Sequence, residues 1–365
     1  MEEFVGTKHM KVKLGDVCEK GSSNIKQSDI TGKMGEYPIY GASGYLGNVD
    51  FYQQESAYVA VVKDGAGIGR TYLHPAKSSV IGTMQYLLPK ENVLPEYLCY
   101  VVKYMHLEKY FSGATIPHIY FKDYKNEEFN LDSLERQEEI INELKRVEDI
   151  MEYRSRELCF LDDLIKARFV EMFVGRGYPV MTLDDLSLGK GEYGAQSASV
   201  PYDSSRPRYV RITDINDDGT LNDDVVSSAN DKDDEQYKLC YGDFLFARMG
   251  ATVGKTYAYT SGNQIFAGYL IRYKLKLEKI LPEYLYAYTR LEEYKNWVIL
   301  NQSGAAQPGI NAKKFGSLQI SVAPLEEQQA FADFVRHVDK SKVAIQKSLD
   351  ETKLLFDSLM QEYFG

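Results

Sequence analysis

The sequence lacks the features of a membrane-spanning, secreted or disulfide-stabilised protein. No run of about 18 apolar residues occurs in the 365 residues, so no transmembrane helix is expected. The first residues contain no apolar core of a signal peptide. The four cysteines (Cys18, Cys99, Cys159 and Cys240) are scattered and form no CxxC pair, which favours reduced thiols and a cytoplasmic location.

The sequence also lacks the spacing patterns of metal sites and of common catalytic sites. Its five histidines form neither an HExxH motif nor a cluster with cysteine, which argues against a zinc site. It contains no GxSxG motif of a serine hydrolase and no NPPY- or DPPY-like tetrad of a base methyltransferase. We therefore expect no catalytic residue, metal or cofactor in this chain. The acidic run 231–235 could bind a cation, but a solvated loop is the simpler interpretation.

Residues 249–256, MGATVGKT, come close to a phosphate-binding loop but miss its spacing. Gly250 lies one position too close to the Gly254–Lys255 pair. The residues that follow, YAYTSGN, favour a strand over the helix whose N-terminus would hold a phosphate. The corresponding loop in the first half of the chain, GAGIGRT, has no lysine, and no Rossmann-type acidic residue follows it. Both segments are therefore predicted to be hairpin turns.

Two long segments with helical periodicity are the most prominent features of the sequence. Residues 134–175 and 325–365 contain no proline, and glycine occurs only as the last residue of each. Apolar residues recur every three or four positions in both, a pattern typical of a coiled-coil seam. Each predicted helix would be roughly 60 Å long at 1.5 Å per residue. The polar residues that interrupt the two seams are Arg154, Arg168, Lys342 and Thr352.

Each long segment follows a block of mixed strand and loop character, and the two blocks resemble each other. The sequence LPEYL occurs in both, at a predicted helix start, and SGATIPHIYFKDY in the first block aligns with SGAAQPGINAKKF in the second. A strand followed by a glycine-rich loop also occurs in each block. Such self-similarity indicates a duplicated domain in which each copy precedes a long helix.

These observations predict an α+β protein of two duplicated domains and two long helices. We expect the domains at residues 1–133 and 179–324, and the helical segments at residues 134–178 and 325–365. Because the helices are separated by a whole domain, they can pair only by folding back along each other. The expected arrangement is an antiparallel coiled coil that links the two domains.

The repeated motifs resemble one known family, the specificity subunits of type I restriction–modification systems. The resemblance rests on YPIYGASG, on the strand followed by a GxxGR or GxxGK loop, on the SGA…PxI segment, and on the L-E-x-Q start of each long helix. It covers essentially the whole chain. It implies two target-recognition domains separated by spacer helices.

The resemblance further implies a non-catalytic subunit that binds double-stranded DNA with a bipartite, asymmetric target. Each domain would read one half-site, and the helices would set the spacer between them. Two methyltransferase subunits would bring S-adenosylmethionine, and restriction subunits would bring ATP with magnesium. The net charge of −10 argues mildly against DNA binding by this chain alone, and basic partner surfaces could offset it.

Loop residues whose side chains suit bases or phosphates are the candidate DNA contacts. Arginine and lysine suit guanine or phosphate, and glutamine suits adenine. The candidates in the first domain are Ser22, Ser23, Lys26, Tyr40, Ser43, Tyr45, Lys63 and Arg70. The candidates in the second domain are Lys190, Tyr193, Gln196, Arg206, Arg208, Arg211, Arg248 and Lys255.

Three other hypotheses remain open from the residues alone. The chain could be the targeting subunit of a related system in which one partner chain carries both methyltransferase and nuclease. It could be a scaffold that binds only proteins and presents two domains on a coiled coil. An enzyme with an unrecognised site is the third, and the missing motifs speak against it.

Overall fold

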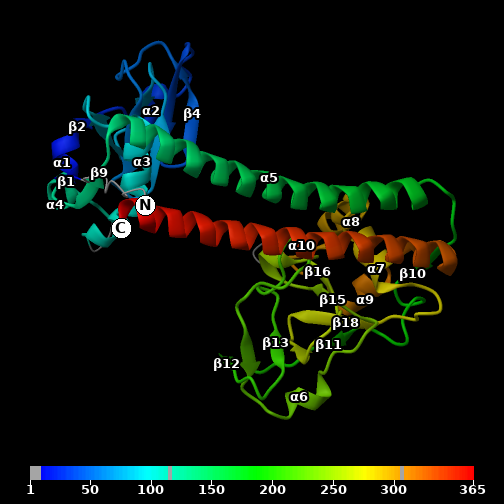
Figure 1. Ribbon diagram of the computed structural model, residues 1–365. Helices are drawn as coiled ribbons and strands as arrows, with labels where there is room; N and C mark the ends of the chain where they lie inside the picture. Colours follow the sequence, from blue (N-terminus) through cyan, green and yellow to red (C-terminus); the bar gives the residue numbers. More distant parts are fainter. Residues whose placement is uncertain (1–9, 114–116, 305–307) are drawn as a thin grey trace, which may run out of the picture. The chain divides into compact units, whose positions relative to one another are not determined.

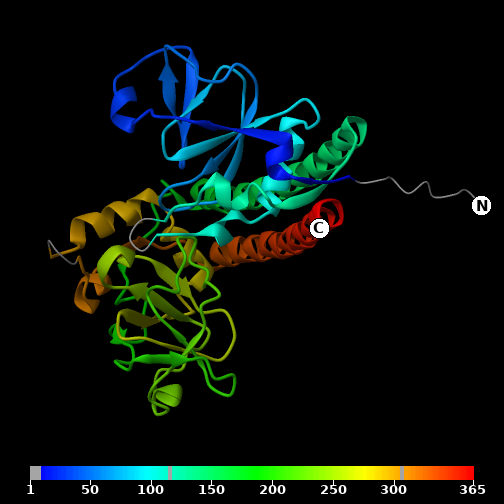
Figure 2. The ribbon, with the colours of Figure 1, turned by 90° about the vertical axis from the view of Figure 1, so that its left-hand side faces the viewer.

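The structure, a computed structural model, describes residues 10–113, 117–304 and 308–365 (Figures 1 and 2). The chain divides into two compact units. The first unit comprises Met1–Ser155 and Lys347–Gly365, and the second comprises Arg156–Gln346. Each long helix therefore contributes one part to each unit. Among the described residues, no helix is long and apolar enough to cross a membrane.

The first unit is built on a four-stranded antiparallel sheet. In spatial order its strands are β2 (Cys18–Ser22), β8 (Met84–Pro89), β5 (Tyr58–Val62) and β6 (Thr71–His74). A second sheet has the order β4 (Gly44–Val49), β3 (Tyr37–Gly41) and β7 (Ser79–Val80). The outer strands β1 (Met10–Lys13) and β9 (Glu128–Leu131) pair antiparallel.

Among the short helices of the first unit, α3 packs on the central sheet. These helices are α1 (Leu14–Val17), α2 (Gln27–Ile30), α3 (Pro95–Tyr104), the 3-10 helix η1 (Leu107–Tyr110) and α4 (Phe121–Tyr124). Pro95 is the first residue of α3, as predicted, where its missing N–H costs no hydrogen bond. The helix ends at Tyr104, and His106 adopts a left-handed φ of 49° before η1.

The second unit repeats this architecture. Its four-stranded sheet has the order β11 (Glu192–Tyr193), β18 (Leu270–Lys274), β15 (Asp243–Ala247) and β16 (Thr256–Ala258). The remaining pairs are β10 (Val180–Thr182) with β19 (Gln319–Ser321), β12 (Ser199–Pro201) with β14 (Val226–Ser228), and β13 (Arg208–Val210) with β17 (Gln264–Phe266). The helices are α6 (Asp233–Gln236), η2 (Gly250–Thr252), α7 (Pro282–Tyr288), α8 (Glu292–Asn301) and α9 (Ala312–Gly316).

Both long helices are present, and their pairing confirms the predicted antiparallel arrangement. They are α5 (Leu134–Phe173) and α10 (Leu325–Phe364), of 40 residues each. In the first unit the beginning of α5 meets the end of α10, where the Tyr363 hydroxyl donates to Glu143 at 2.5 Å. In the second unit the end of α5 meets the beginning of α10, where the rings of Phe169 and Phe331 lie 5.4 Å apart. Lys342, predicted as a polar seam residue, donates to Asp162 of α5.

The glutamine of the L-E-x-Q motif joins each long helix to its domain. Gln137 is fully buried, and its side chain accepts a hydrogen bond from the Leu94 amide at the start of α3. Its amide group donates to two backbone carbonyls. Gln328 is equally buried and makes the same three kinds of bond, with the Leu281 amide at the start of α7 as its donor. Each copy of the motif therefore satisfies equivalent backbone groups in its own unit.

Candidate nucleic-acid interface

Two of the repeated sequence motifs come together in the first unit. The loop after β5 contacts the segment that leads into α4. The Ile119 amide donates to the Lys63 carbonyl at 3.0 Å, and the Gly65 amide donates to the Pro117 carbonyl at 3.0 Å. We call this contact loop junction 1, formed by residues 63–65 and 117–119. Residues 114–116 of the SGA…PxI segment lie outside the described part of the chain.

The second unit has the same junction at equivalent positions. The Ile310 amide donates to the Arg248 carbonyl at 2.9 Å, and the Gly250 amide donates to the Pro308 carbonyl at 2.8 Å. This is loop junction 2, formed by residues 248–250 and 308–310. The bonding pattern makes Arg248 the structural equivalent of Lys63. Two of the predicted contact residues thus occupy the same place in the two copies.

Side chains at loop junction 1 form a partly exposed polar and aromatic cluster. His118 Nδ1 lies 2.6 Å from Asp64 Oδ1, and Lys63 Nζ lies 3.9 Å from the other oxygen of Asp64. The ring of Tyr120 stacks on His118, and Lys122 lies over Tyr120 at 5.3 Å. The sequence pointed only to Lys63 as a contact here, although His118, Tyr120 and Lys122 lie in a motif that it showed to be repeated.

Side chains at loop junction 2 bring three predicted contact residues together from distant parts of the sequence. The Arg248 guanidinium lies 4.9 Å from the ring centre of Tyr193 and 5.6 Å from that of Tyr269. Its Nε donates to the Gly268 carbonyl at 3.1 Å. Gln196 lies against Gly268, so closely that a Cβ there would come within 2.1 Å of its side-chain nitrogen. Tyr269, which is about half exposed, was missed by the sequence reasoning.

Two other predicted arginines of the second unit are held by carboxylates. Arg206 donates to both oxygens of Asp234, at 2.7 and 2.8 Å. Arg211 donates to the fully buried Asp214 and to Asp224. Such paired, charge-assisted bonds fix both guanidinium groups inside the unit. A base could be read by these arginines only at the cost of those bonds.

The remaining predicted cations of the second unit also have partners. Lys190 donates to Asp184 near the start of the domain. Lys255 lies 2.8 Å from a carboxylate oxygen of the exposed Asp217. Arg208 donates to a backbone carbonyl at 2.6 Å. The two lysines pair with surface or partly exposed carboxylates, so DNA could displace these ion pairs at small cost.

In the first unit, the β3–β4 hairpin carries Tyr40 in β3, Ser43 in the turn and Tyr45 in β4. The Tyr40 ring stacks on that of His74 at 4.2 Å, and Tyr45 packs edge-on against Tyr40 at 6.0 Å. Burial lowers the pKa of His74 to about 4, so this ring is neutral at pH 7. Tyr40 is therefore part of an aromatic wall, while Ser43 and Tyr45 are exposed.

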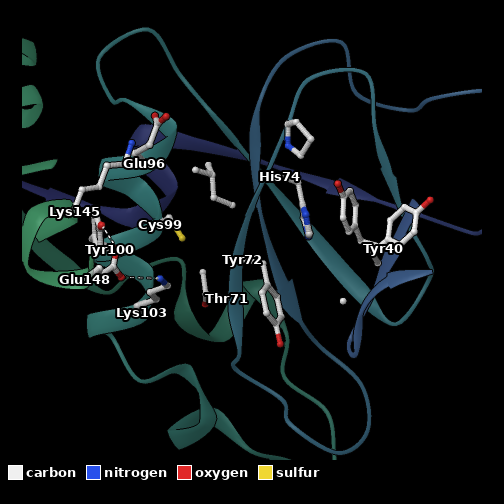
Figure 3. A pocket seen from close by; sticks show the side chains of 14 residues that line it. Tyr40, Thr71, Tyr72, His74, Glu96, Cys99, Tyr100, Lys103, Lys145 and Glu148 are labelled. Carbon is white, nitrogen blue, oxygen red and sulfur yellow. Dashed lines mark hydrogen bonds and ion pairs between the residues drawn. The ribbon is translucent and has the colours of Figure 1, made fainter. Parts of the chain in front are cut away.

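This aromatic wall lines one side of a pocket of about 410 Å³ (Figure 3). Figure 3 shows Tyr40, Tyr72 and His74 on one side of it, and side chains of α3 and α5 on the other. Three polar groups of that second side bond to one another: the Tyr100 hydroxyl donates to Glu148 at 2.5 Å, and Lys103 lies 3.8 Å from Glu148. The charged residues Glu96 and Lys145 also line the pocket.

The last predicted contacts of the first unit differ in accessibility. Ser22, Lys26 and Arg70 are exposed. Ser23 is buried, and its hydroxyl accepts a hydrogen bond from the Ile25 amide. Ser23 therefore supports the loop from inside.

The near-match to a phosphate-binding loop is a hairpin, as predicted. Strands β15 and β16 pair antiparallel on either side of it, and β16 stands where a phosphate-binding loop would need a helix. The Gly250 amide donates to the Pro308 carbonyl, and Lys255 donates to the Ile215 carbonyl at 3.1 Å. Within the residues described, no group of three or more His, Cys, Asp or Glu side chains could hold a metal ion.

Comparisons with known proteins agree with this architecture. The family model described as "Type I restriction modification DNA specificity domain" matches residues 7–158 and 178–352. A comparison with curated proteins found no match.

Two solved structures share the fold. The crystal structure of the type I restriction-modification S subunit from M. genitalium has a TM-score of 0.61 at 14% identity, over 100% of this chain and 98% of that one. A chain from a study of complex assembly and conformational transition in the type I R-M system has a TM-score of 0.56 at 16% identity, over 97% of both chains.

Proposed function

Because this chain belongs to the family of type I restriction modification DNA specificity domains, we propose that it reads a bipartite, asymmetric DNA target with one half-site for each domain. The observation that carries the proposal is the pair of loop junctions. Their backbone bonds are the same, but their side chains present different chemistry. Two copies with identical side chains would favour two identical half-sites, whereas these favour an asymmetric pair.

The long helices are the spacer between the half-sites. Each of the two helices has 40 residues and contributes one part to each unit. A regular helix resists bending, and its length therefore sets how far apart two domains read DNA. A change in helix length should change the number of unspecified base pairs.

Partner subunits supply the chemistry. Specificity domains of this family recognise DNA, and the proposed partners are two methyltransferase subunits with S-adenosylmethionine and restriction subunits with ATP and magnesium. Exposed apolar side chains along both long helices are suited to such protein contacts. They include Tyr153, Phe160, Val343 and Leu354. The chain itself acts as a non-catalytic subunit in this proposal.

Methylome sequencing tests the proposal most directly. Cells that express the chain with its methyltransferase partner should show one methylated motif made of two different half-sites and a fixed spacer. A single palindrome, or no methylated motif, would contradict the proposal. Exchange of residues 179–324 for the same domain of a relative should replace one half-site and leave the other unchanged.

Purification of the complex separates the closest alternative. If one partner chain carries both methyltransferase and nuclease, purification of the complex yields a single large partner instead of separate subunits. Stable protein partners without any DNA specificity would instead support a scaffold that binds only proteins.

A further inference from the structure

Arg248 differs from three arginines of its unit in the groups that hold its guanidinium. Arg206, Arg211 and Arg272 each bond to carboxylates. Among the described residues, no carboxylate lies within ion-pairing distance of Arg248, whose guanidinium lies over the rings of Tyr193 and Tyr269. Its positive charge is therefore not neutralised within the protein.

The aromatic rings and the Gly268 carbonyl together orient this guanidinium. Cation–π contacts restrict the plane of the group, and the bond from Nε to Gly268 restricts rotation within that plane. The Tyr193 ring is itself held, because its hydroxyl accepts a hydrogen bond from the Ala312 amide at 3.2 Å. An arginine held in this way loses less side-chain entropy when it binds.

The atoms left for a ligand are the two terminal nitrogens. Since Nε is engaged by Gly268, Nη1 and Nη2 remain as donors among the bonds that the structure describes. Two parallel N–H donors match the O6 and N7 acceptors of guanine in the major groove, which is the commonest base-specific contact of arginine. A phosphate would also accept such bonds, but a phosphate contact carries no sequence information.

We propose that Arg248 reads one guanine in the half-site recognised by the second unit, through paired hydrogen bonds from Nη1 and Nη2. This inference rests on the proposed function. Lys63, its equivalent in the first unit, lies beside Asp64 and has a single terminal nitrogen, so it cannot make the same paired contact. The paired contact from two terminal nitrogens is therefore available at loop junction 2 and not at loop junction 1.

The test compares methylated motifs of complexes that contain wild-type chain, Arg248→Lys or Arg248→Ala. Both variants should relax one G·C position of one half-site, with a loss of roughly 10-fold or more in discrimination there. The other half-site should be unchanged. Arg248→Lys retains the charge and a similar stem, so it decides the matter if Arg248→Ala does not fold.

Arg290→Lys is the matched control, because the guanidinium of Arg290 in the same unit also lies over a tyrosine ring, that of Tyr286, but outside loop junction 2. It should keep every base of the motif. If Arg248→Lys also keeps every base, and Arg248→Ala only weakens binding equally for all sequences, Arg248 contacts phosphate and the inference is overturned. Failure of the wild-type complex to give a bipartite motif would overturn the proposed function itself, and the two failures are thereby distinguished.

Discussion

Loop junctions 1 and 2 have the same backbone and different side chains. In both, the carbonyl of the residue that follows the strand accepts a hydrogen bond from the isoleucine amide of the PxI segment, and a glycine amide donates to the proline carbonyl. The equivalent side chains are Lys63 and Arg248, Asp64 and Met249, His118 and Gly309, and Tyr120 and Asn311. The comparison indicates that the fold keeps the position of the reading residues constant and varies only what they offer to a base.

The difference between His118 and Gly309 has a steric basis. A Cβ at Gly309 would lie 2.7 Å from the sulfur of Met249, so a side chain there would have to displace its neighbour. In the first unit the corresponding residue, His118, instead bonds to Asp64. Each junction therefore consists of side chains matched to each other, and single substitutions should not convert one junction into the other.

The largest effect on stability is expected from the buried glutamines that the two units share. Gln137→Ala and Gln328→Ala should each destabilise the unit concerned by about 3 kcal/mol, because each removes a fully buried side chain and leaves three mostly part-buried backbone groups without that partner. Thermal unfolding and hydrogen exchange would measure this. Gln329→Ala, at the exposed neighbouring position, is the matched control and should have little effect. A shift as small as that of the control would show that the glutamines do not join helix and domain.

A smaller effect on stability is expected from acidification, through His74 of the first unit. Burial lowers the pKa of His74 in the folded state to about 4, below the ordinary value of 6.5. As the pH falls, His74 therefore binds a proton in the unfolded chain before it does so in the folded chain. The free energy of unfolding that the protein has above pH 6.5 is reduced as the pH falls towards 4. The loss at pH 5 should be about 2 kcal/mol. The second unit has Tyr259 at the equivalent end of its strand.

His74→Phe removes the titrating group and keeps a ring against Tyr40. The melting temperature of this variant should depend less on pH between 6.5 and 5 than that of the wild type. Equal pH dependence of the two proteins would mean that other groups dominate acid unfolding.

Substitution of a side chain that differs between the junctions should change the recognition of one half-site only. His118→Ala removes the partner of Asp64 and the ring that stacks on Tyr120. We expect a loss of about 1 kcal/mol in discrimination, confined to the half-site of the first unit. Methylome sequencing would measure it. A change in the half-site that Arg248 affects would show that the domains do not read separate half-sites.

The smallest effect concerns the orientation of Arg248. Tyr269→Ala removes one of its two ring partners and should cost about 0.5–1 kcal/mol of discrimination at the same guanine. Tyr269→Phe keeps the ring and should read that position as the wild type does. If both variants behave alike, the Tyr269 ring does not orient the guanidinium.

Much of the fold could be predicted from the sequence because its signals are local or repeated. Helical periodicity without proline predicts α5 and α10, and Pro95 predicts the start of α3. The site was less predictable. Arg206, Arg211 and Arg248 look alike in sequence, yet two are held by carboxylates and one lies against tyrosine rings.

The sequence by itself determined the duplication, the two long helices and their antiparallel pairing, since a repeated pattern and its chain order suffice for these. Only the tertiary structure decided which charged side chains are available to DNA. That depends on contacts between residues far apart in the chain, such as Arg206 with Asp234 or Arg248 with Tyr193. The energy of an ionic or aromatic contact depends on distance in space, and periodicity and local propensity carry no information about it.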